Sequence, residues 1–236
     1  MDGSQLMPSF SIVIAQQDTS RSLLDYIAQG GPIGMIIILI SLVAIGMIAA
    51  QLFRIRRDRL APPELIEDLR ALLADREIEL SIQRCKETDS PSFVSRVVGA
   101  ALRRSSRSQF GLLELRSAVE EMGQLEVERM YRMTDGIGLI ASVAPMLGLL
   151  GTVVGMLGAF DTITLSDGPA RPDQLAGSIS QALITTVLGL IVAIPATAMY
   201  TYLRNRIDHL TTEIGETIDD LIAPLEAADS SGANPQ

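Results

Sequence analysis

The sequence predicts an all-α integral membrane protein with three transmembrane helices and long helical extensions on one side of the membrane. Three runs of at least 25 residues contain no charged side chain: Tyr26–Phe53, Gly136–Phe160 and Gln174–Leu203. A helix of about 20 residues already spans a hydrocarbon core of roughly 30 Å, so each run is long enough to cross it. In addition, 47% of the residues are hydrophobic, more than one soluble core of this size needs.

Arginines flank one end of each run and predict the orientation of the chain. The flanking residues are Arg54, Arg56, Arg57 and Arg59 after the first run, Arg129 and Arg132 before the second, and Arg204 and Arg206 after the third. Basic residues remain on the cytoplasmic side of a membrane. The N-terminus is therefore expected outside, in the periplasm, and the C-terminus in the cytoplasm, which agrees with three crossings.

These two signals divide the chain into eight segments. In order, they are a periplasmic amphipathic segment (1–30), transmembrane helix 1 (31–53), a cytoplasmic helical domain (54–135), transmembrane helix 2 (136–160), a periplasmic loop (161–177), transmembrane helix 3 (178–203), a cytoplasmic C-terminal helix (204–227) and a disordered tail (228–236). In the first segment the apolar stretch Ser9–Ala15 is short and Asp2 precedes it. A cleaved signal peptide begins with basic residues and has a longer apolar region, so we favour a segment lying on the membrane, with a signal peptide as the alternative.

The cytoplasmic segments show helical patterns. Pro62 and Pro63 precede an apolar repeat at helical spacing, and a second helix is expected over about Ser92–Arg104. A third helix begins near Phe110 and meets no breaker stronger than single glycines before the second span, which predicts one helix running from cytoplasm into membrane. After the third span, apolar residues recur at intervals of three and four and predict a seam against a neighbouring helix. They are Ile207, Leu210, Ile214, Ile218, Leu221 and Leu225.

Composition excludes several functions. The chain has one cysteine, Cys85, and one histidine, His209, so no disulfide, Cys-His pair or histidine-rich metal site is expected. GLLGTVVG contains no lysine and lies inside a span, so it is not a phosphate-binding loop. The RRSSR stretch at 103–107 lacks interleaved aromatic residues in a chain of net charge −9, which argues against nucleic acid. We expect no enzyme activity, no metal and no cofactor.

The second run combines apolar residues with a glycine seam. Its glycines recur at intervals of three and four and therefore share one helix face, beside Thr152. They are Gly148, Gly151, Gly155 and Gly158. Small residues at this spacing most often serve close packing between membrane helices, and a threonine there usually bonds its own backbone one turn back. Pro145 and Pro195 are expected to kink the second and third helices.

The third run also presents a polar face, on which Ser178, Gln181, Thr185 and Gly189 follow one another, with Thr186 beside them. The first run has no comparable face. Spans two and three are therefore expected to line something together, with the first span outside. No Asp or Glu lies inside any of the three runs. Either the chain conducts no ions, or a partner helix supplies the acid.

Two motifs carry a resemblance to a known family. APMLGLLGTVVGMLGAF (144–160), followed by GSISQALITTVLGLIVAIPATAMY (177–200), resembles the MotA/TolQ/ExbB proton channel family, and its ExbB branch most closely. The resemblance covers roughly Met122 to Arg204. It implies a homopentameric ring in the bacterial inner (cytoplasmic) membrane around the single-span helices of a dimeric ExbD- or TolR-like partner that carries the protonatable aspartate. Ion flow would drive rotation, and a TonB-like protein would receive the work.

The resemblance also implies roles for individual residues. Thr152 and Thr186 match threonines that line the ion path and face the partner's aspartate, and Pro145 and Pro195 match family prolines. Two positions depart from the family pattern. Gln181 stands where well-known relatives have glutamate, which removes a titratable group from the outer mouth of the ring. Thr185 often corresponds to alanine in proton-using relatives. The transported ion is therefore expected to be the proton, with Na⁺, whose ligands the clustered hydroxyls resemble, as the alternative.

Two other interpretations remain open at this stage. Within the family, the chain could serve envelope integrity as a TolQ-like subunit instead of energising outer-membrane transport with TonB. In a different class, it could be a membrane scaffold that conducts nothing. The scaffold predicts no acid-bearing partner and no effect of changing Thr152 or Thr186.

Overall fold

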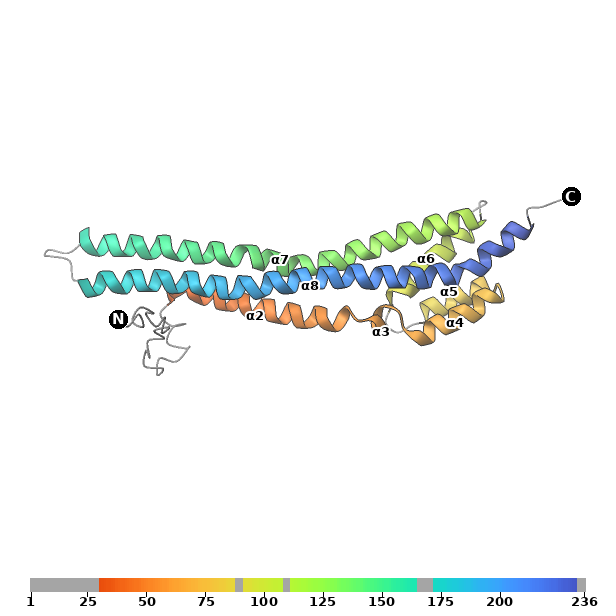
Figure 1. Cartoon of the computed structure of the whole chain (residues 1–236), viewed down its shortest axis with the longest axis horizontal. Helices are drawn as coiled ribbons and strands as arrows, with labels where there is room; N and C mark the ends of the chain where they lie inside the picture. Colours follow the sequence, from red (N-terminus) through yellow and green to blue (C-terminus); the bar gives the residue numbers. More distant parts are fainter. Residues whose placement is uncertain (1–29, 88–90, 108–110, 165–171, 233–236) are drawn as a thin grey trace, which may run out of the picture.

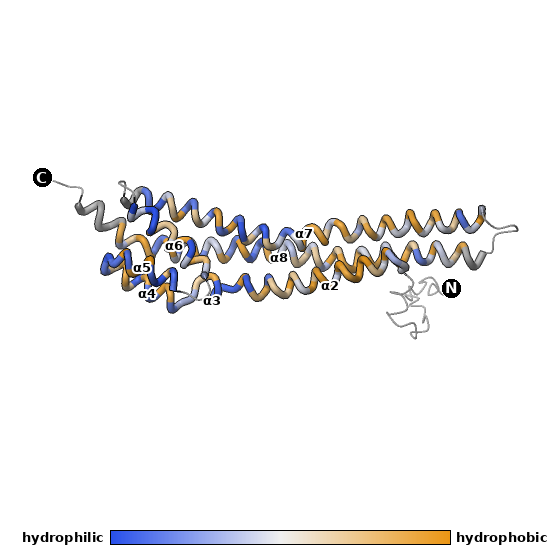
Figure 2. Tube along the Cα trace, turned by 180° about the vertical axis from the view of Figure 1, so that it is seen from behind, coloured by the Kyte–Doolittle hydropathy of each residue, from blue (hydrophilic) through white to orange (hydrophobic). Residues whose placement is uncertain are grey.

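The structure, a computed structural model, describes residues 30–87, 91–107, 111–164 and 172–232. Every regular element within these ranges is an α-helix. Three of the helices are long and apolar enough to cross a membrane, which confirms the predicted fold class at this level. The elongated arrangement has an apolar half and a polar half (Figure 2). The prediction for the first 29 residues lies outside the described ranges.

The first apolar helix, α2 (Gly31–Arg54), starts at a glycine with a φ of +61° and a proline in its first turn. Glycine adopts a positive φ without strain, and proline is preorganised for a helix start. The side chains of α2 are largely exposed, as expected for a helix that lipid surrounds. Its Gln51 is the exception, because its side-chain amide donates a hydrogen bond of 2.8 Å to the Met133 carbonyl.

The other two apolar helices form an antiparallel pair along the whole molecule (Figure 1). They are α7 (Gly111–Thr164) and α8 (Pro172–Gly232), and their mutual contact is the most extensive in the structure. Each combines an apolar span with a polar extension in one unbroken helix, as predicted. The helices extend beyond the expected segment bounds into the loop predicted over 161–177, because Pro172 can start a helix and Asp161–Thr164 contains no breaker. Likewise α8 continues to Gly232, within the tail predicted as disordered, since adding residues to an existing helix is easier than starting one.

Four shorter helices form a group at the polar half of this pair, and α4 and α6 contact the pair directly. They are α3 (Arg57–Leu60), α4 (Pro63–Ala74), α5 (Ile78–Lys86) and α6 (Phe93–Ser105). Ser92 caps α6 by accepting a hydrogen bond of 3.1 Å from the Ser95 backbone, a standard helix start. The chain turns between α4 and α5 at Arg76, where φ is +59°. Helices α3 and α5 are too short to produce a clear periodic signal and were not predicted.

The core of the polar half lies between these short helices and the long pair. All six residues of the predicted apolar seam on α8 are buried in it, together with Leu69, Leu73 and most of the apolar face of α6. This confirms that the seam packs against neighbouring helices. Cys85 also belongs to this core, next to Gly99 of α6. Burial raises the pKa of its thiol to about 11, so it is an unreactive packing residue.

Candidate ion pathway

A hydrogen bond joins the two polar spans at the predicted pathway threonine of α8. The hydroxyl of Thr186 donates to the carbonyl of Gly148 on α7 over 3.0 Å. A threonine inside a membrane helix usually bonds its own backbone. Thr186 does not, so its hydroxyl lies at the contact between the two helices and remains partly accessible.

The glycine seam explains how the helices come close enough for this bond. A Cβ added at Gly148 would lie 3.0 Å from the Thr186 Cα, and one added at Gly155 would lie 2.7 Å from the Ala182 Cβ. A Cβ at Gly151 would overlap the Thr185 side chain. Gly158, the fourth member of the predicted seam, has open space around it. Three of the four glycines therefore form the α7–α8 contact in this structure.

Gly189 is a fourth close-approach glycine, on the opposing helix. A Cβ there would lie 2.6 Å from the Ala144 carbonyl oxygen and 3.2 Å from the Gly148 Cα. Both neighbours are backbone atoms, which cannot rotate away. The sequence placed Gly189 on the polar face of the third span, but its role in the backbone contact depends on the tertiary arrangement.

The other two candidate threonines bond their own helices. Thr152 donates to the Leu149 carbonyl over 2.6 Å, and Thr185 donates to the Ala182 carbonyl over 2.7 Å. Thr152 is half-exposed, whereas Thr185 is only 2% exposed and lies against Gly151. In all three threonines the hydroxyl hydrogen points to a carbonyl, which leaves the oxygen lone pairs available to accept a hydrogen bond or contact a cation.

Gln181 lies apart from Thr186. It borders a cavity of about 360 Å³ between the start of α2, the glycine seam of α7 and the outer part of α8, and its side chain contacts Gly31. Ser178 and Thr185 line the same cavity. Gln181 and Thr185 thus line one cavity, with Thr185 also at the α7–α8 contact through Gly151, whereas Thr186 meets Gly148 at that contact and is not among the cavity's lining residues.

The two family-type prolines lie inside helices that continue past them. Pro145 in α7 is half-buried and Pro195 in α8 is exposed. Proline has no backbone N–H, so the carbonyls of Ala141 and Ile191 lose their usual helical partner. Such freed carbonyls in a membrane need another donor.

A polar cluster in the polar half of the pair was not predicted from the sequence. The Tyr131 hydroxyl donates to the Asp208 carboxylate, and the Arg204 guanidinium stacks 4.5 Å from the Tyr131 ring centroid. Arg204 also donates to the Tyr200 hydroxyl over 2.7 Å. Only the spacing of four between Tyr200 and Arg204 could have indicated part of it, because Tyr131 and Asp208 are 77 residues apart.

The charged residues that the structure describes lie outside the three apolar runs, mostly in the polar half of the molecule, with Asp161 and Asp173 at the opposite end of the long pair. Within the described residues, no group of three or more His, Cys, Asp or Glu side chains is placed to hold a metal ion. The polar groups of the three charge-free runs are hydroxyls, glutamine amides and backbone exposed at glycines. These groups can bind or pass an ion, but none of them titrates near neutral pH.

The structure combines three apolar helices, a close glycine-mediated pair and hydroxyls within the spans. These features are typical of a polytopic helical membrane protein of the channel or transport class. Residues 89–216, more than half of the chain, match the MotA/TolQ/ExbB proton channel family. The chain belongs to this family, which confirms the resemblance seen in the sequence. The matched residues include α6, α7 and the spanning part of α8. The family is one of proton channels and not of enzymes.

Individual relatives show the same relationship. The chain is 34% identical over 115 residues to a biopolymer transport protein ExbB homolog from Methanothermobacter thermautotrophicus, covering 49% of this chain and 39% of that protein. It is 35% identical over 100 residues to the Tol-Pal system protein TolQ from Haemophilus influenzae, covering 42% of this chain and 43% of TolQ. These matches thus cover about two-fifths of the length of the curated relatives.

Proposed function

We propose that this chain is the ring-forming subunit of an ion-driven stator. Five copies would surround the single-span helices of an ExbD- or TolR-like dimer, with α7 and α8 lining the inside. The observation that carries the proposal is the Thr186–Gly148 hydrogen bond, a half-accessible polar contact in spans that contain no carboxylate. A channel that moves protons through such spans needs a titratable group from elsewhere, and the partner helix would supply it.

The exposed surface of the long pair is consistent with assembly. Large apolar side chains cover both helices on faces that the single chain leaves open, including Leu149, Met156, Leu183 and Ile194. In a ring, part of this surface would contact neighbouring copies and part would contact lipid. The arginine distribution supports an inner-membrane protein with a periplasmic N-terminus and a cytoplasmic C-terminus.

The test is native mass spectrometry of the full chain co-expressed with a single-span partner that carries an aspartate in its helix. We expect five copies of this chain with two of the partner. A complex that forms equally well when the partner's aspartate is changed to asparagine would still fit, because the acid serves conduction rather than assembly. A monomer or dimer that binds no partner would contradict the proposal and favour the scaffold.

The recipient of the mechanical work is the second part of the proposal. We favour a TonB-like protein and energised transport across the outer membrane. Similarity to TolQ supports the alternative, a TolA-type recipient and envelope integrity. Site-specific cross-linking from the periplasmic side, with both recipient types present, separates the two, since only the true recipient should cross-link in an ion-dependent way.

The transported ion gives a direct prediction. We expect proton flux through the complex in liposomes to be unchanged when Na⁺ is replaced by K⁺ at constant ionic strength. The threonine hydroxyls are spread over two places, at Thr185 beside α2 and at Thr186 beside Gly148, whereas a Na⁺ site needs several oxygens around one point. Loss of flux in K⁺ would instead show that Na⁺ is carried.

A further inference from the structure

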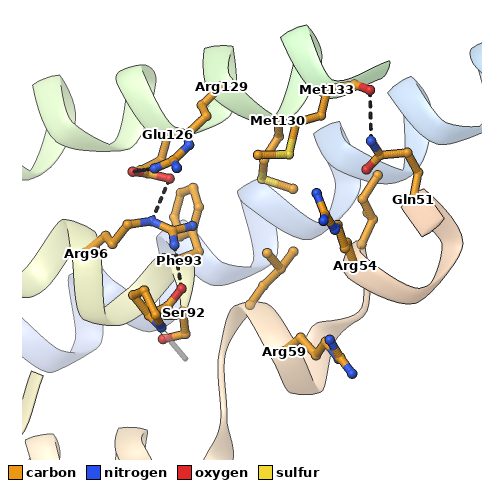
Figure 3. Close-up of a pocket in the computed structure, with 13 residues that line it drawn as sticks. Gln51, Arg54, Arg59, Ser92, Phe93, Arg96, Glu126, Arg129, Met130 and Met133 are labelled. Atoms are coloured by element: carbon orange, nitrogen blue, oxygen red, sulfur yellow. Dashed lines mark hydrogen bonds and ion pairs between the residues drawn. The ribbon is translucent and has the colours of Figure 1, made fainter. Parts of the chain in front are cut away.

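A second cavity lies where α2 leaves the apolar half of the molecule. Its volume is about 290 Å³, and its walls come from the end of α2, α3, the start of α6 and the middle of α7 (Figure 3). The colouring by hydropathy changes from apolar to polar at this level of α2 and α7 (Figure 2). The cavity therefore lies at the depth expected for lipid head groups on the cytoplasmic side.

Positive charge dominates the cavity. Four arginines line it, namely Arg54, Arg59, Arg96 and Arg129, with Glu126 as the single carboxylate, so the lining carries a net charge of +3. Arg96 and Arg129 both turn toward Glu126, at 2.7 and 3.6 Å (Figure 3). Arg54 and Arg59 have no acidic partner among the residues that the structure describes. One carboxylate cannot neutralise four guanidinium groups, so the cavity favours an anion.

The other residues that line the cavity are mostly apolar, and hydrogen bonds fix the end of α2 beside them. Ile55, Leu60 and Phe93 are buried, and Met130 lies beside them. Two long-range hydrogen bonds hold the end of α2 in place. Gln51 donates to the Met133 carbonyl over 2.8 Å, and Arg206 of α8 donates to the Ile55 carbonyl over 3.0 Å. The cavity therefore combines a fixed apolar floor with unpaired cationic groups at its rim.

We propose that this cavity binds the phosphate group of an anionic phospholipid, with the acyl chains lying along α2. Guanidinium groups form paired hydrogen bonds to phosphate oxygens. The exposed apolar side chains of α2 provide a surface for the chains, among them Val43, which lies three turns before Arg54 on the same helix face. A free phosphate ion would use the same arginines but would gain nothing from the apolar neighbours. The proposal does not depend on ion conduction.

The test uses the full chain in detergent, stripped of lipid, with native mass spectrometry to count bound phosphatidylglycerol or phosphatidylcholine of equal acyl length. The double variant Arg54→Gln/Arg59→Gln removes the two unpaired charges, and both side chains are exposed, so the fold should survive. We expect phosphatidylglycerol affinity to fall roughly ten- to thirtyfold, with phosphatidylcholine unaffected. The variant Arg54→Lys/Arg59→Lys should lose less affinity than the glutamine variant, because lysine retains the charge but cannot form the paired hydrogen bonds.

The matched control is Arg56→Gln/Arg57→Gln, which removes two charges from the same segment outside the cavity. Arg56 stacks on Phe53 and Arg57 pairs with Glu213. This control should bind phosphatidylglycerol like the unmodified chain. Equal losses in both double variants would indicate a diffuse surface charge and overturn the proposal. Displacement of the lipid by millimolar inorganic phosphate would assign the cavity to free phosphate and overturn it as well.

Discussion

Replacing Thr186 with valine should abolish ion flux while leaving the assembled complex intact. Valine has nearly the same shape as threonine but cannot donate to the Gly148 carbonyl, which now receives a 3.0 Å bond. Interhelical hydrogen bonds in membranes contribute only about 0.6 kcal/mol on average, so the helix pair should persist. Loss of a positioned proton-transfer group, in contrast, lowers rates by roughly a hundredfold or more. Proton flux in liposomes containing this chain and its partner measures the effect.

Two variants make this comparison specific. Thr186→Ser keeps the hydroxyl and should retain most of the flux. Thr197→Val removes a hydroxyl from the same helix that bonds only its own backbone, at the Ala193 carbonyl over 2.8 Å, and it should also conduct. If Thr186→Val conducted at the normal rate, Thr186 would be a packing residue and the scaffold interpretation would gain support.

The apolar spans and the α8 seam could be predicted because each depends on a local signal. A run without charge and an apolar repeat of three and four are both properties of one helix. The long helices followed from the absence of breakers between Gly111 and the second span. The sequence also identified the residues of the glycine seam, although Gly158 shows that spacing alone does not reveal which members contact the opposing helix.

The remaining features arise from contacts between segments far apart in the chain. The residue pattern alone did not distinguish Thr186 from other membrane threonines. Only the register of α7 against α8 assigns its hydroxyl to Gly148. The arginines near residue 54 were expected as a marker of orientation. Their arrangement with Arg96 and Arg129 around one carboxylate depends on how four helices meet. Similarly, the Tyr131–Asp208 contact joins two helices whose register no local pattern specifies.

The contacts that join α7 and α8 differ between the two halves of the helix pair. In the polar half, α7 and α8 are joined by the Tyr131–Asp208–Arg204 cluster and a large apolar core. In the apolar half their contact depends on glycines and on one interhelical hydroxyl. The polar half is therefore held by many strong contacts, whereas the spanning half has few. Close backbone approach is the main stabilising feature there, so it should be sensitive to a single added methyl group.

Gly189→Ala should accordingly destabilise the protein, whereas Gly158→Ala should not. The new Cβ at position 189 would lie 2.6 Å from the Ala144 carbonyl oxygen, and relief requires the two helices to separate. Overpacking of this kind costs about 1–3 kcal/mol, and the higher helix propensity of alanine offsets up to roughly 1 kcal/mol of that. At position 158 the methyl group meets open space, so the propensity gain remains.

Size-exclusion chromatography after heating in detergent measures the difference, as the temperature at which half of the monodisperse peak is lost. We expect a decrease of roughly 2–8 °C for Gly189→Ala and no decrease for Gly158→Ala. Flux should fall with Gly189→Ala as well, because separation of the helices lengthens the Thr186–Gly148 bond. A stable Gly189→Ala protein with normal flux would show that α7 and α8 are further apart than this structure places them, and the Thr186 contact would then lose its support. If Gly158→Ala instead disrupted the assembly while the isolated chain kept its stability, position 158 would belong to a contact between subunits.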